Sequence, residues 1–417
     1  MAIDHKEKLI SGGRERIDRT TMALKDKNLD ALVCALPTNV LMLTGYFPVV
    51  GTSIALASRD GQVCLFVPED EAEFARRGWA SEISTFKPGS LEDLTGAVDV
   101  VEPILRESLS RLGLNGKRVG CEYGPHFQPS SYASMHLYGA SLIDLLDGAD
   151  VHAAPADAMI SRLRAVKTPD EIERIRRSCA AAERAYSIGR QHLQPGLRER
   201  EAANLFESQR EELELSDIEA ARVGGYVFCM AGENSLNANA AYQRSSGKVL
   251  RQDEFVVVHC NSHADGYWTD ITRTYFLGTP DEKRREMYAA VFEAREAAMA
   301  AIRPGVAAAD VDGAARGVLT SRGFGEFFKH GTGHGVGFAA IDHGAIPRLH
   351  PASPDVLEAG MTFNVEPAIY IEPASGMRHC DMVAVTDSGC EVLTPFHTEV
   401  NELTVEVGSA ASGRAAI

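Results

Sequence analysis

The sequence lacks the features that mark several classes of protein. No stretch approaches the roughly 18 to 20 apolar residues that a membrane-spanning helix needs, and none behind Met1 could serve as a signal peptide. The glycine patterns of phosphate loops and dinucleotide-binding folds are missing as well. We therefore expect neither a membrane protein nor one of the common nucleotide-binding folds.

Basic residues and paired cysteines are also scarce. Lys and Arg number 42 against 58 Asp and Glu, and the net charge of −16 disfavours nucleic acid or an anionic membrane as the partner. The eight cysteines are scattered and include no CxxC pair. Such spacing is typical of reduced thiols rather than a disulfide framework, so we expect a cytoplasmic protein.

What is present is a globular composition in a chain long enough for two domains. Of the 417 residues, 45% are apolar and 24% are charged. Residues 1–160 alternate helical and strand-like segments. Two of the strand-like segments, 54–58 and 63–67, flank an Asp60-Gly61 turn and predict a hairpin. This region therefore predicts an α/β domain with a partly mixed sheet.

Residues 161–417 predict a second domain. Near its start, Thr168-Pro169-Asp170-Glu171 has the pattern of a capping box with proline at the first helical position. A Pro-Gly pair separates two helical segments at 195–196, and again at 304–305. This recurrence indicates either two similar halves around a pseudo-symmetric sheet, with a site between them, or only a common way to separate helices.

Several segments of the second domain carry side chains that bind metals or transfer protons. Asp, His and Glu at the ends of separate strands can hold a divalent ion, because strands fix their positions rigidly. Each segment also has an ordinary structural explanation when it is taken alone. The side chains are His259, Asp270, His330, His334, Glu366, Arg378 and Cys380.

The order of these segments resembles the creatinase/prolidase/aminopeptidase P family of "pita-bread" proteins, and the resemblance covers nearly the whole chain. It implies an α/β (α+β) fold, in which a small N-terminal creatinase-like domain precedes a pseudo-symmetric catalytic domain. It also implies a hydrolase that acts on a small molecule or short peptide, and a homodimer. The matching segments are 39–46, 167–172, 266–274, 333–337 and 365–367.

The metal positions implied by the family are only partly kept. Peptidases of this family hold two ions with two Asp, one His and two Glu. Asp270, His334 and Glu366 match, whereas the first Asp is His259 and the last Glu is Cys380. The second ion loses its carboxylates, so we expect one divalent ion, with Cys380 and His259 as further candidate ligands. A thiolate or imidazole would favour Zn²⁺ or Fe²⁺ over Mn²⁺.

A metal-free site is the alternative, since creatinase resembles the peptidases and works without metal. His259 and Cys380 would then lie close together, because the residues they replace share an ion. A histidine can activate a thiolate nucleophile in a confined site. Cys380 would otherwise be an inert buried thiol.

The histidines that assist peptide cleavage in the family are not kept either. Their positions fall on Asn239 and Ile341. His343 or His263 could take over that role. We expect His330 and Arg378 to orient ligands. Asn239 and Tyr267 are candidates for binding substrate.

Three functions follow from these residues. The first is a hydrolase that uses one metal-activated water to cleave a C–N bond in a small peptide-like or amino-acid-derived substrate. The second is a creatinase-like metal-free hydrolase, or a lyase, acting on a small polar metabolite; Glu233, Glu366 and Asp381 would favour a cationic one. The third is an inactive binding homologue.

Overall fold

We describe the protein from a computed structural model that covers residues 2–49, 52–87, 97–123, 142–211, 220–239, 245–342, 344–373 and 375–407. The chain forms two compact units, Met1–Glu173 and Arg174–Ile417. No helix in the described ranges is both long and apolar enough to cross a membrane. The expected domain boundary after residue 160 falls within helix α6 (Asp157–Ala165) of the first unit.

The described residues of the first unit form a six-stranded sheet in the order β4-β3-β2-β1-β5-β6. Strands β1–β2 and β2–β3 pair antiparallel, and the other neighbours pair parallel, so the expected mixed sheet and its hairpin are confirmed. The strands are β1 (Ala31–Cys34), β2 (Ile54–Ser58), β3 (Val63–Pro68), β4 (Glu82–Phe86), β5 (Arg118–Cys121) and β6 (His152–Pro155).

Helices cover this sheet through apolar stripes. In α4, Val101, Leu105 and Leu109 recur at helical spacing and are buried in the core together with strand residues such as Val33. The helices are α1 (Ala2–Asp26), α2 (Pro37–Thr44), η1 (Glu69–Glu71), α3 (Ala72–Ala75), α4 (Ala97–Arg111), α5 (Leu142–Asp147) and α6.

Helix α7 (Pro169–His192) begins with the expected capping box. The Glu171 backbone N–H donates to Thr168 Oγ1 at 3.3 Å, and the Thr168 N–H donates to Glu171 Oε2 at 2.8 Å. Glu171 is also paired with Arg16, whose Nε donates to Glu171 Oε1 at 2.9 Å. Both charges are buried, so each needs the other.

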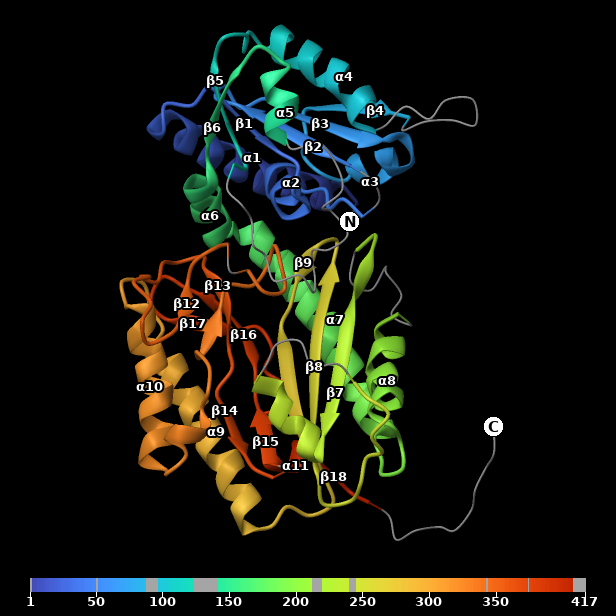
Figure 1. Ribbon diagram of the computed structural model, residues 1–417, viewed down its shortest axis with the longest axis vertical. Coiled ribbons are helices and arrows are strands. Elements are labelled where there is room, and N and C mark those ends of the chain that lie inside the picture. The colour runs from blue at the N-terminus through green and yellow to red at the C-terminus, as the bar shows by residue number, and fades with distance from the viewer. Residues whose placement is uncertain are drawn as a thin grey trace. The chain divides into compact units, whose positions relative to one another are not determined.

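The second unit contains several sheets flanked by pairs of helices (Figure 1). The largest has the order β18-β10-β8-β7, with β9 paired to β8, and Tyr186 of α7 donates from its hydroxyl to the carbonyls of Val258 and Ile271 in it. Its elements are α8 (Glu199–Glu211), β7 (Val223–Ala231), η2 (Gly232–Asn239), β8 (Phe255–Ala264), β9 (Tyr267–Trp268), β10 (Ile271–Leu277), α11 (Val400–Leu403) and β18 (Thr404–Val405).

The remaining strands form a three-stranded sheet, β13-β16-β17, and two two-stranded sheets, β11-β12 and β14-β15. Helices α9 and α10 run beside them in Figure 1. These elements are α9 (Glu282–Ala301), α10 (Ala308–Ser321), η3 (Gly325–Phe327), β11 (Gly333–His334), β12 (Arg348–Leu349), β13 (Thr362–Val365), β14 (Ala368–Ile371), β15 (Ser375–Arg378), β16 (Asp381–Val385) and β17 (Cys390–Val392).

The two Pro-Gly segments make the same backbone contacts. Gly196 N–H donates to Leu250 O at 2.9 Å, and Gly305 N–H donates to Leu357 O at 2.8 Å. Leu250 and Leu357 each donate back to the residue that follows the glycine. Both glycines have positive φ, 97° and 87°, which a residue with a Cβ rarely adopts. The recurrence is therefore an internal structural repeat, and it relates the two halves that carry the site.

Candidate metal centre and substrate cavity

The hairpin of the first half carries the candidate residues His259 and Asp270. His259 lies on β8 opposite Thr272 of β10, and Asp270 immediately precedes β10. Cys380 comes from the other half and forms a backbone bridge with Thr272: each N–H donates to the other carbonyl, at 3.1 and 3.3 Å. The register of these strands therefore brings three of the candidate residues together.

The second half supplies His334 from β11 and Glu366, which directly follows β13. His334 N–H donates to Asn364 Oδ1 at 2.7 Å, and Glu366 N–H donates to Thr332 O at 2.7 Å. A Cβ on Gly333 would lie only 1.9 Å from Asn364 O. The glycine beside His334 is needed because it lets β11 approach β13 this closely.

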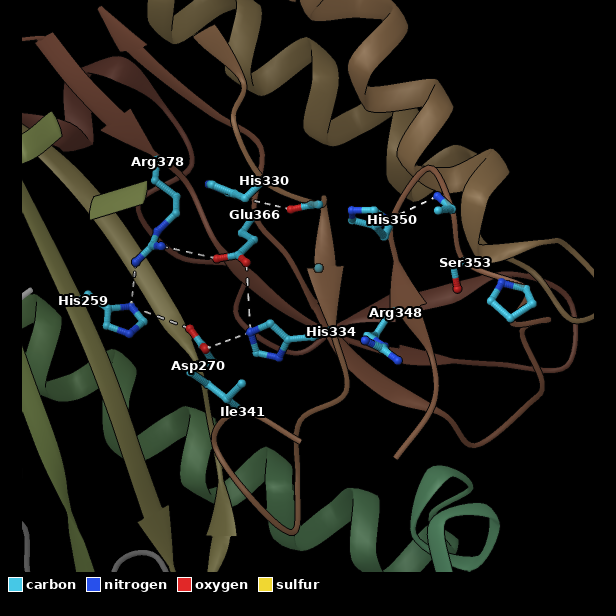
Figure 2. Close-up of a pocket in the computed structure, with 14 residues that line it drawn as sticks. His259, Asp270, His330, His334, Ile341, Arg348, His350, Ser353, Glu366 and Arg378 are labelled. Carbon is cyan, nitrogen blue, oxygen red and sulfur yellow. Dashed lines mark hydrogen bonds and ion pairs between the residues drawn. The ribbon is translucent and has the colours of Figure 1, made fainter. Parts of the chain in front are cut away.

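The side chains of Asp270, His334 and Glu366 point to one small region (Figure 2). His334 Nε2 lies 3.5 Å from Asp270 Oδ2 and 4.0 Å from Glu366 Oε1. One ligand atom each of Asp270, Glu366 and Cys380 lies within 4.8 Å of the others. Donors of one ion bound at about 2.0–2.3 Å are separated by such distances. The two carboxylates and the imidazole therefore fit one divalent ion, and the thiol lies close enough to the same two carboxylates to be a further donor.

Arg378 occupies the neighbouring position, where it faces His259. Its Nη2 donates to His259 Nδ1 at 3.0 Å, and its Nε donates to Thr272 Oγ1 at 3.1 Å. Its Nη1 lies 3.6 Å from Glu366 Oε2. A second ion here would meet an imidazole nitrogen that is already engaged and a thiol, where the family has two carboxylates to balance the charge of the arginine. The residues present do not fit two ions.

The titratable groups of the centre have shifted pKa values. Burial lowers the pKa of His259 to about 4, although Asp270 opposes this shift. Burial, reinforced by the charge of Asp270, raises the pKa of the Cys380 thiol well above its ordinary value. Burial would lower the pKa of His334, but its hydrogen bond to Asp270 and the charges of Asp270 and Glu366 raise it to about 9.

These directions bear on the thiolate alternative. His259 and Cys380 each contact Asp270, at 3.6 Å, and the described residues include no hydrogen bond between His259 and Cys380. A neutral imidazole beside a neutral thiol is not an activated nucleophile. The arrangement therefore gives no support to a His259–Cys380 catalytic pair.

His330 is held rigidly at the edge of the centre. Its Nδ1 donates to Gly331 O at 2.8 Å, and its Nε2 lies 3.0 Å from the Tyr370 hydroxyl. Two residues of α10 fix the same segment: Arg316 donates to the His330 carbonyl at 2.9 Å, and Asp312 accepts from Thr332 N–H at 2.9 Å. No sequence pattern singles out these two, because an Asp and an Arg four residues apart look like an ordinary surface pair on a helix.

A cavity of about 500 Å³ opens beside the centre. His259, Asp270, His330, His334, Glu366 and Arg378 line it. Its opposite wall contains Arg348 and His350, which were not anticipated (Figure 2). The two-residue strand β12 is too short to read as a strand in the sequence, so no pattern drew attention to them.

Other candidates lie elsewhere. Tyr267 is fully buried, does not line the cavity, and its carbonyl accepts from the Ser178 hydroxyl at 2.6 Å. His263 packs on Trp268, with ring centroids 4.5 Å apart, and is likewise no part of the cavity wall. The Asn239 side chain and His343 lie outside the described residues.

The acidic residues expected to favour a cationic substrate are also placed elsewhere, apart from Glu366. Glu233 is exposed and does not line the cavity. Asp381 is fully buried and paired with Arg295 and with Arg273, whose Nη2 donates to it at 2.7 Å. Its charge is therefore neutralised inside the core.

Two family models match the chain. The model of metallopeptidase family M24 matches residues 173–387, and that of the creatinase/prolidase N-terminal domain matches residues 16–166. An uncharacterized peptidase of Staphylococcus saprophyticus is 30% identical over 91% of this chain and 99% of its own length. An Xaa-Pro dipeptidase of Pyrococcus furiosus is 29% identical over 93% and 99%.

Solved structures are similar as well. The prolidase from Pyrococcus horikoshii superimposes with a TM-score of 0.72 at 26% identity, over 93% of this chain and 99% of that one. The prolidase from Pyrococcus furiosus gives 0.70 at 27% identity, over 90% and 99%. An Xaa-Pro dipeptidase from Bacillus anthracis is 24% identical over 95% of this chain and 100% of that one. Its TM-score of 0.75 supports the same fold.

Proposed function

This chain belongs to metallopeptidase family M24, and on that premise we propose that it is a hydrolase resembling Xaa-Pro peptidases that depends on one divalent metal ion. It would cleave a C–N bond in a small peptide-like or amino-acid-derived substrate. One observation carries the proposal: Asp270, His334 and Glu366 converge on one region, while Arg378 fills the position next to it.

Asp270, His334 and Glu366 would hold the ion, with the Cys380 thiol as a further donor. When bound, a divalent ion supplies a Lewis acid that polarises a carbonyl and lowers the pKa of water. The two carboxylates and Arg378 carry a net charge of one negative, which one divalent ion turns into one positive. A second ion would add two more buried positive charges. The imidazole and thiol donors favour Zn²⁺ or Fe²⁺ over Mn²⁺.

The charges that remain on the cavity wall indicate the kind of substrate. With Asp270 and Glu366 engaged by the ion, the other formally charged side chains that line the cavity are Arg348 and Arg378. Arg348 is exposed and lies opposite His334 in the β11–β12 pair, so the two side chains share a face about 5 Å apart at Cβ. A free carboxylate on a dipeptide-sized substrate would pair with Arg348.

Metal content is the first test. Protein purified without added metal and then soaked in Zn²⁺, Fe²⁺ or Mn²⁺ is expected to hold one ion per chain by mass spectrometry. Asp270→Ala should abolish binding, and Asp310→Ala, at an exposed position on α10, should leave it intact. Two ions per chain, or none under any loading, would contradict the proposal.

A substrate panel is the second test. Xaa-Pro dipeptides should be cleaved, and their C-terminal amides should be poorer substrates because they lack the carboxylate. Turnover of creatine-like guanidines or betaine-type solutes by ion-free protein would instead support the metal-free hydrolase or lyase. Binding of the dipeptides without turnover would support an inactive homologue.

Two further expectations remain part of the proposal. The eight cysteines are all free thiols, which supports a reducing compartment such as the cytoplasm. We also expect a homodimer, which the molecular mass in solution would test.

A further inference from the structure

We propose that His350 is a catalytic residue, whose Nε2–H donates a hydrogen bond to the substrate oxygen that becomes negatively charged during hydrolysis. It would replace the donors lost where the family histidines fall on Asn239 and Ile341. This inference rests on the proposed hydrolase function.

The backbone of β12 directs His350 into the cavity. Leu349 is fully buried, whereas its neighbours Arg348 and His350 are exposed and both line the cavity. Side chains alternate along an extended segment, so burying Leu349 turns the other two to the opposite side. Figure 2 shows His350 on the wall facing Glu366 and Arg378.

The local hydrogen bonds determine which nitrogen can donate. The backbone N–H of Ala352 donates to His350 Nδ1 at 3.1 Å, so Nδ1 serves as an acceptor and carries no proton. A neutral imidazole then has its proton on Nε2. Among the residues that the structure describes, Nε2 has no partner.

The ring is also close to the segment that carries His334. A Cβ built on Gly331 would lie 3.3 Å from His350 Cδ2, the ring carbon bonded to Nε2. No side chain therefore separates His350 from the backbone between His330 and His334. A larger residue at 331 would press on this ring.

The other cavity histidines are committed elsewhere. His259 is buried and is hydrogen-bonded both to Arg378, through Nδ1, and to the Asn261 side chain, and both nitrogens of His330 are engaged. His334 is a candidate ligand. His350 is thus the cavity histidine that offers an N–H to a substrate.

Hydrolysis needs only a hydrogen-bond donor beside the carbonyl oxygen of the substrate. When water attacks the carbonyl carbon, a C–O bond forms and the π electrons move onto the carbonyl oxygen. His350 stabilises that charge without giving up its proton. As the oxygen re-forms the double bond, the C–N bond breaks, and the leaving nitrogen takes a proton that came from the water. The products are a carboxylic acid and an amine, and His350 is unchanged.

The decisive experiment compares His350→Ala with His350→Gln on leucyl-proline, with metal content measured on the same samples. Removing such a donor typically lowers kcat about 100-fold or more. We expect that loss in the alanine variant, with an unchanged ion content. Glutamine keeps an amide N–H near the same place, so kcat should recover to within about 10-fold of the wild type. His192→Ala, exposed at the end of α7, is the matched control.

Three outcomes would overturn the inference. His350→Ala could keep full kcat while His343→Ala loses it, which would assign the role to His343. The glutamine variant could be as slow as the alanine variant and lose one limb of the pH–rate profile, which would indicate proton transfer. ¹⁵N spectra of histidine-labelled protein could show the His350 proton on Nδ1.

Failure of the proposed function would look different. Wild-type protein would then hydrolyse no member of the substrate panel, whatever its ion content. The ¹⁵N spectra need no turnover, so they would still decide whether His350 presents an Nε2–H donor.

Discussion

The two sides of the metal centre are built on one hairpin and have opposite character. Asp270 and His259 are both almost fully buried, at 2% and 5% exposure, and lie at the same end of the β8–β10 pairing, where Cys380 forms its bridge with Thr272. Asp270 lies close to His334, and so does Glu366, so two carboxylates meet around this imidazole. His259 faces Arg378, which offers N–H groups and a positive charge.

This difference teaches that burial and strand register do not by themselves make a metal site. Both positions are equally well fixed. What separates them is the charge of the neighbouring groups: two carboxylates meet near Asp270, whereas the guanidinium of Arg378 meets His259, and a buried cation is repelled by a buried positive charge. On the proposed function, a side chain at position 259 that accepts from Arg378 without bringing a negative charge would leave room for one ion instead of two.

Removing a candidate metal ligand beside Asp270 should have the largest effect on metal binding. His334→Ala removes one candidate ligand and leaves the carboxylates of Asp270 and Glu366 without the imidazole between them. Metal affinity should fall by more than about 100-fold, because the loss of outer partners alone costs about 10–100-fold. Titration with a chromophoric zinc chelator measures this, with His192→Ala as control. Unchanged affinity would remove His334 from the ligand set.

Adding carboxylates around position 259 should have the next largest effect, which is on the number of ions bound. The double variant His259→Asp with Cys380→Glu adds two carboxylates, so two divalent ions would leave the same net charge as one ion in the wild type. We expect two ions per chain by mass spectrometry. The single variant His259→Asp should still hold one, because its new carboxylate would pair with Arg378.

Circular dichroism would show whether the double variant keeps its fold, since Glu is larger than the buried thiol it replaces. A folded double variant that holds only one ion would show that charge is not what limits the number of ions.

The sequence predicted the features that depend on a few neighbouring residues, and it missed those that depend on very short strands or on distant segments. The β2–β3 hairpin and the Thr168–Glu171 capping box are local patterns, and both are confirmed. The set of Asp270, His334 and Glu366 came from the resemblance to the family, because their positions at strand ends left each with an ordinary structural explanation. Arg348 and His350 were missed, because a two-residue strand has no readable alternation. The ion-pair partners of residues such as Asp381 come from distant segments of the chain, and no pattern in a single sequence predicts such pairs.

The close approach of β11 to β13 should be sensitive to a single methyl group. Gly333→Ala would place a Cβ 1.9 Å from Asn364 O, so backbone must shift and carry His334 away from Asp270. We expect a loss of about 3 kcal/mol in the free energy of unfolding, and weaker metal binding. Gly313→Ala on α10 meets nothing within 4 Å and should stabilise by about 0.5–1 kcal/mol. Equal effects in urea unfolding would contradict this.

A histidine away from the centre should show the smallest effect and separates general pH sensitivity from that of the metal site. His397 is half-buried beside the Tyr275 hydroxyl, 2.9 Å from its Nδ1, and burial lowers its pKa to about 4. The unfolded chain has a pKa near 6.5 and binds the proton first as pH falls. The folded state therefore loses stability from pH 6.5 down to pH 4, by about 1–2 kcal/mol after allowance for solvent screening. His397→Gln should flatten the curve of unfolding free energy against pH in this window, in protein without metal. A wild-type slope retained by the variant would mean that other groups, such as the site carboxylates, dominate acid sensitivity.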